Sequence, residues 1–206
     1  MVNRLTLLHT SPVHVPVFDA LAERDHPGVA LRHVVRPGLL EQARAVGAEG
    51  VRGEVREVLA GVGGPVLVTC STIGGVAESL QRELGFPVLR VDRAMAARAV
   101  GTGPRVVVLA ALESTLGPSA ELLAEEGAEE VRGLVVPGAW EMFEAGDEGA
   151  YLRAVARAAD RVTGADVIVL AQASMAGAVG LVRTRIPVLG SPALGLAAAV
   201  AEGRTG

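Results

Sequence analysis

The sequence predicts an α/β fold built from two similar halves with parallel sheets, and three observations support this. Residues 34–41 recur at residues 134–141 without a gap, a shift of 100 positions (134 − 34). The apolar run that ends before Cys70 is matched by one that ends before Gln172, a shift of 102 (172 − 70). Short aliphatic runs also alternate with helix-length stretches rich in Ala, Leu, Glu and Arg. Two copies of this length indicate an internal duplication.

We therefore expect two domains, residues 1–100 with the Cys70 loop and residues 101–206 with the Gln172 loop. Residues 101–104, Gly-Thr-Gly-Pro, indicate a turn that is too short to be a flexible linker. Half of the residues are hydrophobic but only 2% are aromatic. The core should therefore be aliphatic and closely packed.

Apolar strands without polar alternation are typical of a sheet buried on both faces, with helices as right-handed crossovers. The expected strands are residues 5–8, 29–35, 66–69, 87–91, 105–110, 130–136, 167–171 and 187–189. The expected helices are residues 15–24, 39–46, 53–60, 75–84, 93–100, 118–126, 138–144, 149–161, 175–182 and 192–201.

Composition excludes several classes of partner. The net charge of −4, the scattered arginines and the few aromatic residues argue against nucleic-acid binding. No apolar stretch reaches the roughly 18 to 20 residues that cross a bilayer, and the first residues lack a signal-peptide pattern, so we expect no membrane association and a cytoplasmic location. The single cysteine fits a reducing compartment, and the four histidines form no ligand cluster that would indicate a metal.

The sequence contains no lysine, so all 19 basic residues are arginine. A Schiff-base lysine is therefore absent, which excludes ordinary pyridoxal-phosphate and lysine-dependent aldol chemistry. The phosphate-binding lysine of a nucleotide-triphosphate loop is absent as well. We expect no cofactor.

The loops that follow the strands are where a ligand should bind, because ligands of parallel sheets gather at the carboxyl ends of strands. Small polar side chains recur in these loops and suit a carboxylate. The predicted substrate-binding residues are Thr10, Ser11, Ser71, Thr72, Ser114, Thr115, Gln172 and Ser174. The alternative for five of them is a role as helix N-caps, namely for Ser71, Thr72, Ser114, Thr115 and Ser174.

Cys70 is the candidate catalytic residue. A lone cysteine is commonly a small buried hydrophobe, but this one ends an apolar strand and precedes a helix N-terminus, which stabilises a thiolate. His9 and His14, on the first strand-exit loop, are candidate second proton carriers, with a capping or surface role as the alternative. Asp92 either orients Cys70 or caps the helix after it, and we favour the cap.

Two similar α/β halves, Cys70-Ser71-Thr72-Ile73-Gly74 at one strand end and residues 170–175 at the other resemble the aspartate/glutamate racemase superfamily, which includes hydantoin racemases, maleate isomerase and arylmalonate decarboxylase. The resemblance covers essentially the whole chain. It implies cofactor-free proton transfer next to a carboxylate, in a cleft between the halves, with one cysteine from each half. It also implies that the last helix, residues 192–201, packs back on the first half.

The sequence departs from this pattern because Gln172 stands where the second cysteine is expected, and an amide does not transfer protons near neutral pH. The main hypothesis is a racemase or isomerase acting on a small carboxylic acid or amino acid, with Cys70 as acid/base or nucleophile. A one-thiol decarboxylase of a malonate-like acid is the alternative, and a non-catalytic carboxylate-binding protein is a third. A homo-oligomer is compatible with the sequence.

Overall fold

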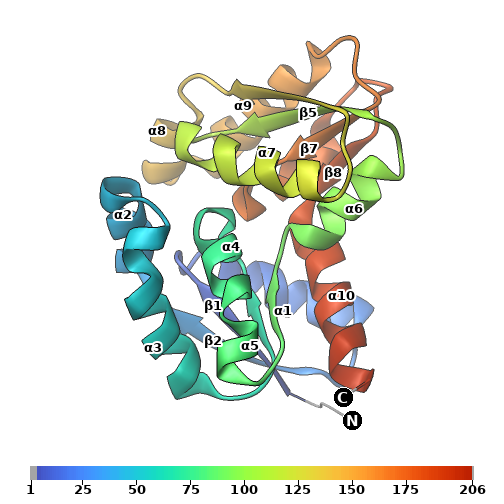
Figure 1. Cartoon of the computed structure of the whole chain (residues 1–206). Helices are drawn as coiled ribbons and strands as arrows, with labels where there is room; N and C mark the ends of the chain where they lie inside the picture. The colour runs from blue at the N-terminus through green and yellow to red at the C-terminus, as the bar shows by residue number, and fades with distance from the viewer. Residues whose placement is uncertain (1–3, 206) are drawn as a thin grey trace. The chain divides into compact units, whose positions relative to one another are not determined.

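The computed structural model describes residues 4–205 and divides into two compact units (Figure 1). Unit 1 contains the described residues up to Asp92 together with those from Pro192 onward, and unit 2 is Arg93–Ser191. We expected the boundary at residues 100/101. It lies earlier because α6 (Arg93–Val100) packs against strand β7 (Val167–Leu170) of unit 2.

Each unit contains a four-stranded parallel sheet, which confirms the predicted fold class. The strand order is β2-β1-β3-β4 in unit 1 and β6-β5-β7-β8 in unit 2, so the two sheets have the same topology. The strands of unit 1 are β1 Arg4–His9, β2 Ala30–Val35, β3 Val66–Val68 and β4 Val88–Arg90. Those of unit 2 are β5 Arg105–Ala110, β6 Glu130–Val135, β7 Val167–Leu170 and β8 Val188–Gly190.

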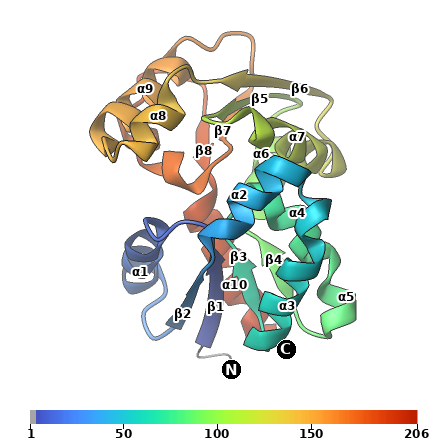
Figure 2. The ribbon, with the colours of Figure 1, turned by 90° about the vertical axis from the view of Figure 1, so that its left-hand side faces the viewer.

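The sheet of unit 1 is covered by helices on both faces, and Figure 2 shows α1 and α3 on opposite sides of it. Its helices are α1 His14–Asp25, α2 Pro37–Val46, α3 Arg52–Val62, α4 Ser71–Ser79, α5 Gln81–Leu84 and α10 Ser191–Thr205, with a 3-10 turn, η1, at Glu49–Val51. Helices α2, α3 and α4 bury Leu39, Leu59 and Ile73 against one face of the sheet. On the other face, Phe18 of α1 and Leu196 of α10 lie in one cluster.

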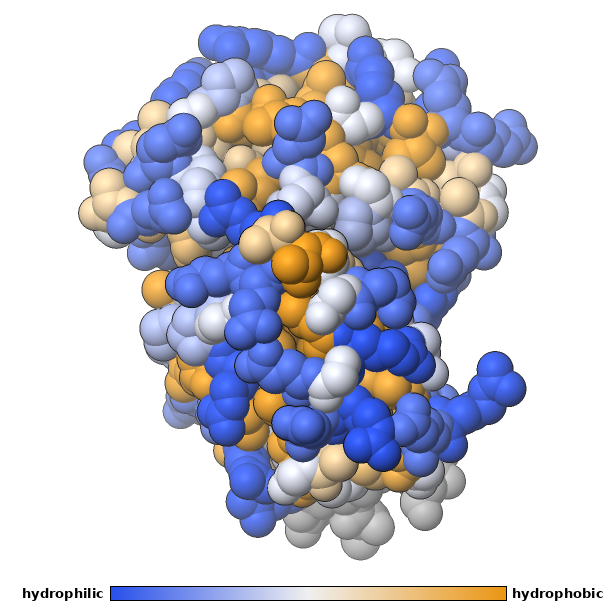
Figure 3. All heavy atoms as spheres, turned by 60° about the vertical axis from the view of Figure 1, so that its left-hand side comes forward, coloured by the Kyte–Doolittle hydropathy of each residue, from blue (hydrophilic) through white to orange (hydrophobic). Residues whose placement is uncertain are grey.

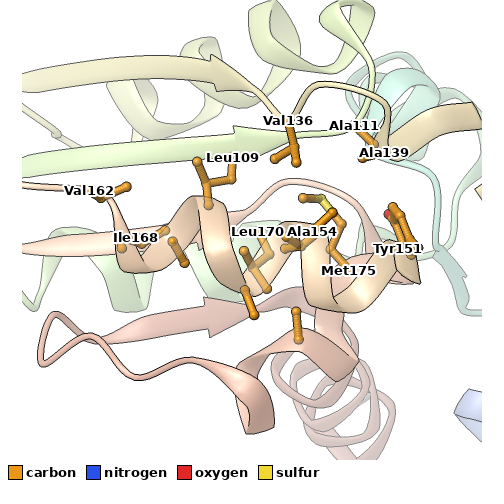
Figure 4. Packing of buried hydrophobic residues seen from close by; sticks show 14 of the residues in the cluster. Leu109, Ala111, Val136, Ala139, Tyr151, Ala154, Val162, Ile168, Leu170 and Met175 are labelled. Atoms are coloured by element: carbon orange, nitrogen blue, oxygen red, sulfur yellow. The ribbon is translucent and has the colours of Figure 1, made fainter. Parts of the chain in front are cut away.

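Unit 2 has an aliphatic core with one buried tyrosine (Figure 4). Its helical segments are α6 Arg93–Val100, η2 Glu113–Thr115, α7 Leu116–Glu125, α8 Ala139–Glu144, α9 Glu148–Asp160 and η3 Ala173–Leu181. Helix α9 buries Tyr151 and Val155 on the face of the sheet that carries Leu109 and Leu170. Buried branched side chains of this kind, at about 25 cal/mol for each Å² removed from water, stabilise the sheet that carries the strand-end loops.

Most predicted helices occur with their ends shifted by up to four residues, and two of the differences bear on the candidate site. The helix expected at residues 175–182 is the 3-10 segment η3, because Gly177 and Gly180 lower its α-helix propensity and the segment packs closely on α9. A Cβ atom at Gly177 would approach Leu152 to 2.9 Å. The helix expected from residue 75 begins at Ser71, directly after Cys70, because Ile73, Ala77 and Leu80 continue its buried face toward the N-terminus.

The surface is mixed in character. On the face in Figure 3, hydrophilic residues predominate and hydrophobic ones emerge in separate areas among them. The large apolar side chains with the most exposure include Val46 and Leu181. Among residues 4–205, no helix combines the length and the hydropathy that a membrane span requires.

Candidate active site

The order of strands in unit 1 creates a switch point between β1 and β3. These strands are neighbours, but β1 leads to β2 on one side and β3 leads to β4 on the other. In parallel sheets, ligands bind at the carboxyl ends of strands at such a point. The loops that meet there begin at Thr10 and at Thr69, and the backbone N–H of Thr69 donates to the carbonyl of Leu8 at 2.9 Å.

Cys70 lies at this switch point. It is a free cysteine, partly exposed, and it occupies the N-cap position of α4 with extended backbone angles of φ −108° and ψ 114°. The free N–H groups of the first turn of α4 carry partial positive charge, which favours an anion at this end of the helix. The position therefore suits a bound carboxylate.

The predicted hydroxyl residues of unit 1 lie directly after β1 and at the start of α4, and most of them are buried. Thr10, Ser71 and Thr72 are only 5–7% exposed, while Ser11 is half-buried. Ser71 and Thr72 are the first two residues of α4. A carboxylate at this site would therefore meet backbone N–H groups more readily than the covered hydroxyls.

A buried ion pair lies at the end of β4. The Arg90 guanidinium donates to both carboxylate oxygens of Asp92, at 2.7 and 3.0 Å, and both side chains are almost fully buried. The guanidinium packs over Gly74 and Gly75 of α4, where Cβ atoms would approach it closely. The structure thus gives Asp92 a role that the sequence prediction did not include: it holds Arg90 against α4, the helix that begins at Ser71, directly after Cys70.

His9 and His14 do not fit the expected role of exposed proton carriers. His9 has no exposed surface and His14 is 9% exposed. Burial, and for His9 also the nearby His33 and His14, lowers the pKa of His9 to about 3, and burial lowers the pKa of His14 to about 4. Both rings are therefore neutral at pH 7, and both nitrogens of His9 are hydrogen-bonded within the protein.

In unit 2, Gln172 occupies the position that Cys70 has in unit 1. Both residues lie two positions after a central strand and directly before a helical segment, and Gln172 has similar backbone angles, φ −114° and ψ 140°. The Gln172 side-chain oxygen accepts a hydrogen bond of 2.5 Å from the backbone N–H of Ala111. This leaves its NH₂ group as the part that can bind a ligand.

The other predicted residues of unit 2 lie on the loops after β5 and β7. Ser114 is exposed, whereas Thr115 is 1% exposed. Ser174 is hydrogen-bonded to the hydroxyl of Tyr151 at 2.8 Å. Burial raises the pKa of Tyr151 to about 12, against the opposing effect of the Ser174 hydrogen bond, so this tyrosine remains a neutral phenol that positions Ser174.

Sequence reasoning missed several residues around these loops, namely Asp19, His33, Thr69, Arg90 and Tyr151. A signal existed for His33, because aligning the neighbouring strands β1 and β2 in parallel places it close to His9. Tyr151 lacked any such signal, since its contact with Ser174 depends on how closely α9 packs on η3.

A separate hollow of about 300 Å³ lies between β2 and α3. Its lining contains none of the predicted site residues; it is formed by Arg32, Val34, Arg36, Glu57, Val58, Gly61 and Val62. Among the described residues, no group of three or more His, Cys, Asp or Glu side chains is arranged to hold a metal ion.

Several solved structures share this fold. Allantoin racemase from Pseudomonas fluorescens superposes with a TM-score of 0.66 and 22% identity over 98% of this chain and 91% of that one. Arylmalonate decarboxylase superposes with a TM-score of 0.62 and 21% identity over 98% of this chain and 93% of that one. Glutamate racemase from Aquifex pyrophilus superposes with a TM-score of 0.62 and 16% identity over 94% of this chain and 82% of that one. At these identities the likeness concerns the fold.

A search of the curated proteins by sequence finds no match to the chain. The family model described as Asp/Glu/Hydantoin racemase matches residues 65–202, which is more than half of the chain and includes both the Cys70 and the Gln172 loops. The chain therefore belongs to the Asp/Glu/Hydantoin racemase family.

Proposed function

We propose that this protein is a cofactor-independent enzyme that transfers a proton at the carbon next to a carboxylate of a small acid or amino acid. The observation that carries the proposal is the position of Cys70, partly exposed at the β1/β3 switch point and at the N-terminus of α4. Membership of a racemase family supports the same reaction class.

In this mechanism the Cys70 thiolate removes the proton, and the electron pair left on carbon moves into the carboxylate as an enolate. N–H groups at the start of α4 stabilise the developing negative charge. For unit 2, we propose that Ser114, Gln172 and Ser174 bind oxygen atoms of the substrate, whereas Thr115, at 1% exposure, is covered by the protein. The Gln172 amide can donate hydrogen bonds but does not return a proton, so the enolate carbon takes its new proton from water on the face opposite Cys70, or from the Cys70 thiol on the same face.

A second candidate function follows from the state of Gln172, whose side-chain oxygen is bound to the Ala111 N–H. Decarboxylation of a malonate-like acid needs only one proton donor. The carbon–carboxylate bond breaks, CO₂ leaves with no charge, and the enolate takes one proton from the Cys70 thiol. A site with one thiol satisfies this reaction without a second acid.

The experiment is incubation in D₂O with single enantiomers of small amino acids and with substituted malonates, followed by proton NMR and chiral chromatography. Deuterium at the α-carbon with loss of optical purity indicates racemisation. Deuterium with retention indicates that Cys70 returns the proton to the same face. Loss of CO₂ indicates the decarboxylase. The absence of exchange and of product with every acid contradicts both enzymes and favours a binding protein.

The residue assignment is tested with Cys70→Ser, compared with Ser79→Ala at the exposed far end of the same helix. Cys70→Ser should lower the rate by at least about 100-fold, since general acid–base catalysis contributes roughly 100- to 10,000-fold. Ser79→Ala should retain the wild-type rate. Activity that survives in Cys70→Ser would show that another residue carries the reaction.

A further inference from the structure

Four side chains of unit 1 form a continuous hydrogen-bonded chain from the surface to the end of β3. Asp19 Oδ1 lies 3.0 Å from His33 Nε2, His33 Nδ1 lies 2.8 Å from His9 Nε2, and His9 Nδ1 lies 2.8 Å from Thr69 Oγ1. The Asp19 side chain is 57% exposed and that of His33 is 15% exposed, whereas His9 and Thr69 are buried. The residues come from α1, β2, β1 and the end of β3.

When His33 is neutral, the donors and acceptors along this hydrogen-bonded chain of side chains have a fixed order. A carboxylate only accepts hydrogen bonds, so His33 Nε2 carries the hydrogen that faces Asp19. The other nitrogen, Nδ1, then accepts from His9 Nε2–H. His9 Nδ1 is left as an acceptor, and the Thr69 hydroxyl donates to it.

When His33 takes up one proton from solvent, donor and acceptor exchange places in the hydrogen bonds between His33, His9 and Thr69. Both nitrogens of His33 then donate, so His9 Nε2 must become an acceptor. The His9 hydrogen moves to Nδ1, which donates to the Thr69 oxygen. The Thr69 hydroxyl turns to its other acceptor, the carbonyl of Leu8 at 3.2 Å. The chain as a whole gains one proton, and that proton comes from water.

The charge should reside on His33 and not on His9. Burial, the neighbouring His33 and the neighbouring His14 together lower the pKa of His9 to about 3, so His9 changes its tautomer while remaining neutral. The groups that face the two rings are Asp19 and His14 from α1, with uncharged Thr69 beside β1. His33 is the ring that lies beside a carboxylate, with Nε2 3.0 Å from Asp19 Oδ1, and its side chain is 15% exposed, so it is the ring that a proton from water can reach.

We propose that Asp19, His33 and His9 are positioning residues for the Cys70 segment, in which the charge of His33 sets the His9 tautomer and thereby the direction of the Thr69 hydroxyl. Thr69 is the residue directly before Cys70, and its N–H also donates to the Leu8 carbonyl. The protonated chain therefore places two hydrogen bonds on Leu8 beside the thiol-bearing residue. The effect on catalysis rests on the proposed function; the switch itself does not.

The direct test is ¹⁵N NMR of the imidazole rings of the intact protein between pH 5 and 9. The four histidines are assigned from single His→Asn variants. His9 should be the Nε2–H tautomer at high pH and the Nδ1–H tautomer at low pH, with the same midpoint as the charging of His33. A single His9 tautomer while His33 becomes charged overturns the proposal, and so does a charged His9.

Asp19→Asn should shift this midpoint, because it removes the carboxylate that accepts a hydrogen bond from His33 Nε2. The matched control is Asp25→Asn, an exposed acid on the same helix that pairs with Arg24 instead. An equal shift in both variants overturns the proposal, because it would assign the effect to the general field of α1. His33→Asn should remove the pH-dependent step of His9.

The link to Cys70 is tested by its alkylation rate with iodoacetamide at pH 6 and pH 8. Thr69→Val should change the ratio of the two rates by about twofold to fivefold, the effect of one altered hydrogen bond. Thr69→Ser should restore the wild-type ratio, since it keeps the hydroxyl. Equal ratios in all three proteins overturn the positioning role. These readouts need no substrate, so a protein inactive toward every acid can still pass or fail them.

Discussion

Gln172 and Ala111 are joined by a hydrogen bond of 2.5 Å between the glutamine side-chain oxygen and the backbone N–H at the end of β5. This bond ties together the ends of the two central strands of unit 2. A thiol at the same position would be a much weaker acceptor. The glutamine therefore has a structural role in unit 2 where its counterpart in unit 1 is the candidate catalyst.

Gln172→Ala should lower the free energy of unfolding by about 1–2 kcal/mol, because a partly buried N–H loses its acceptor. Chemical denaturation measures this change. Gln81→Ala is the matched control, since Gln81 accepts from the backbone N–H of Val88 at 3.1 Å in unit 1. Both variants should be destabilised to a similar extent, but only Gln172→Ala should lower the rate of exchange in D₂O. An equal loss of rate in the two variants would contradict a role for Gln172 in substrate binding.

Gly74→Ala should destabilise the protein by roughly 1–3 kcal/mol, the usual effect of overpacking. A Cβ atom at Gly74 would lie 3.0 Å from Arg90 Cβ, and Arg90 cannot retreat while it is paired with Asp92. Gly53→Ala in α3 is the control, because its Cβ would meet no atom within 4 Å. It should be neutral or stabilising by up to about 1 kcal/mol. Thermal unfolding monitored by circular dichroism separates the two, and equal effects would show that the contact with Arg90 is unimportant.

Asp92→Asn should cost about 3–5 kcal/mol, because it removes the buried negative charge that accepts two hydrogen bonds from the Arg90 guanidinium. Asp25→Asn breaks the exposed pair with Arg24 and should change the free energy of unfolding by less than about 1 kcal/mol. Urea denaturation at pH 7 provides the comparison. A mild effect at Asp92 would mean that solvent or other polar groups replace the carboxylate.

Acid should destabilise the protein through His9 and His14. Their pKa values of about 3 and about 4 lie below the unfolded value of 6.5, so the unfolded chain binds more protons between these limits. The contribution of these two neutral histidines to the free energy of unfolding is complete above about pH 6.5 and is lost as the pH falls toward 3 to 4. At pH 5 each histidine should account for a loss of about 2 kcal/mol relative to pH 7.

The measurement is the free energy of unfolding at pH 7 and at pH 5. His14→Gln should reduce the difference between the two by about half, because one of the two buried rings no longer takes up a proton on unfolding. A difference that is unchanged in this variant would indicate that other groups dominate the acid response.

Much of the fold was predictable because its signals are local. The strand Arg105–Ala110 and the helix Arg93–Val100 have the predicted bounds, since aliphatic runs and turn residues mark both ends. The start of α4 was predicted too late because Gly74 and Gly75 suggested a helix boundary. Their small size instead admits the Arg90 side chain.

The side-chain networks around the strand ends were not predictable from periodicity. His9 contacts Thr69, 60 residues away, and His33, 24 residues away, and these contacts need the parallel register of three strands at once. The position of Cys70 between a strand end and a helix was predictable from the apolar run before it, although the helix begins four residues earlier than expected.

The pairing of α10 with β1 and α1 has a consequence for biosynthesis. Leu5, Leu7 and Phe18 share a cluster with Leu196 and Val200, so one face of unit 1 is completed by residues translated only after all of unit 2. When β4 has left the ribosomal exit tunnel, the hydrophobic face of unit 1 that binds α10 therefore stays exposed until α10 has also been translated. Unit 2 is one continuous segment, so all of its residues have been translated before α10 is made. We therefore expect unit 2 to fold on the ribosome before unit 1 is complete.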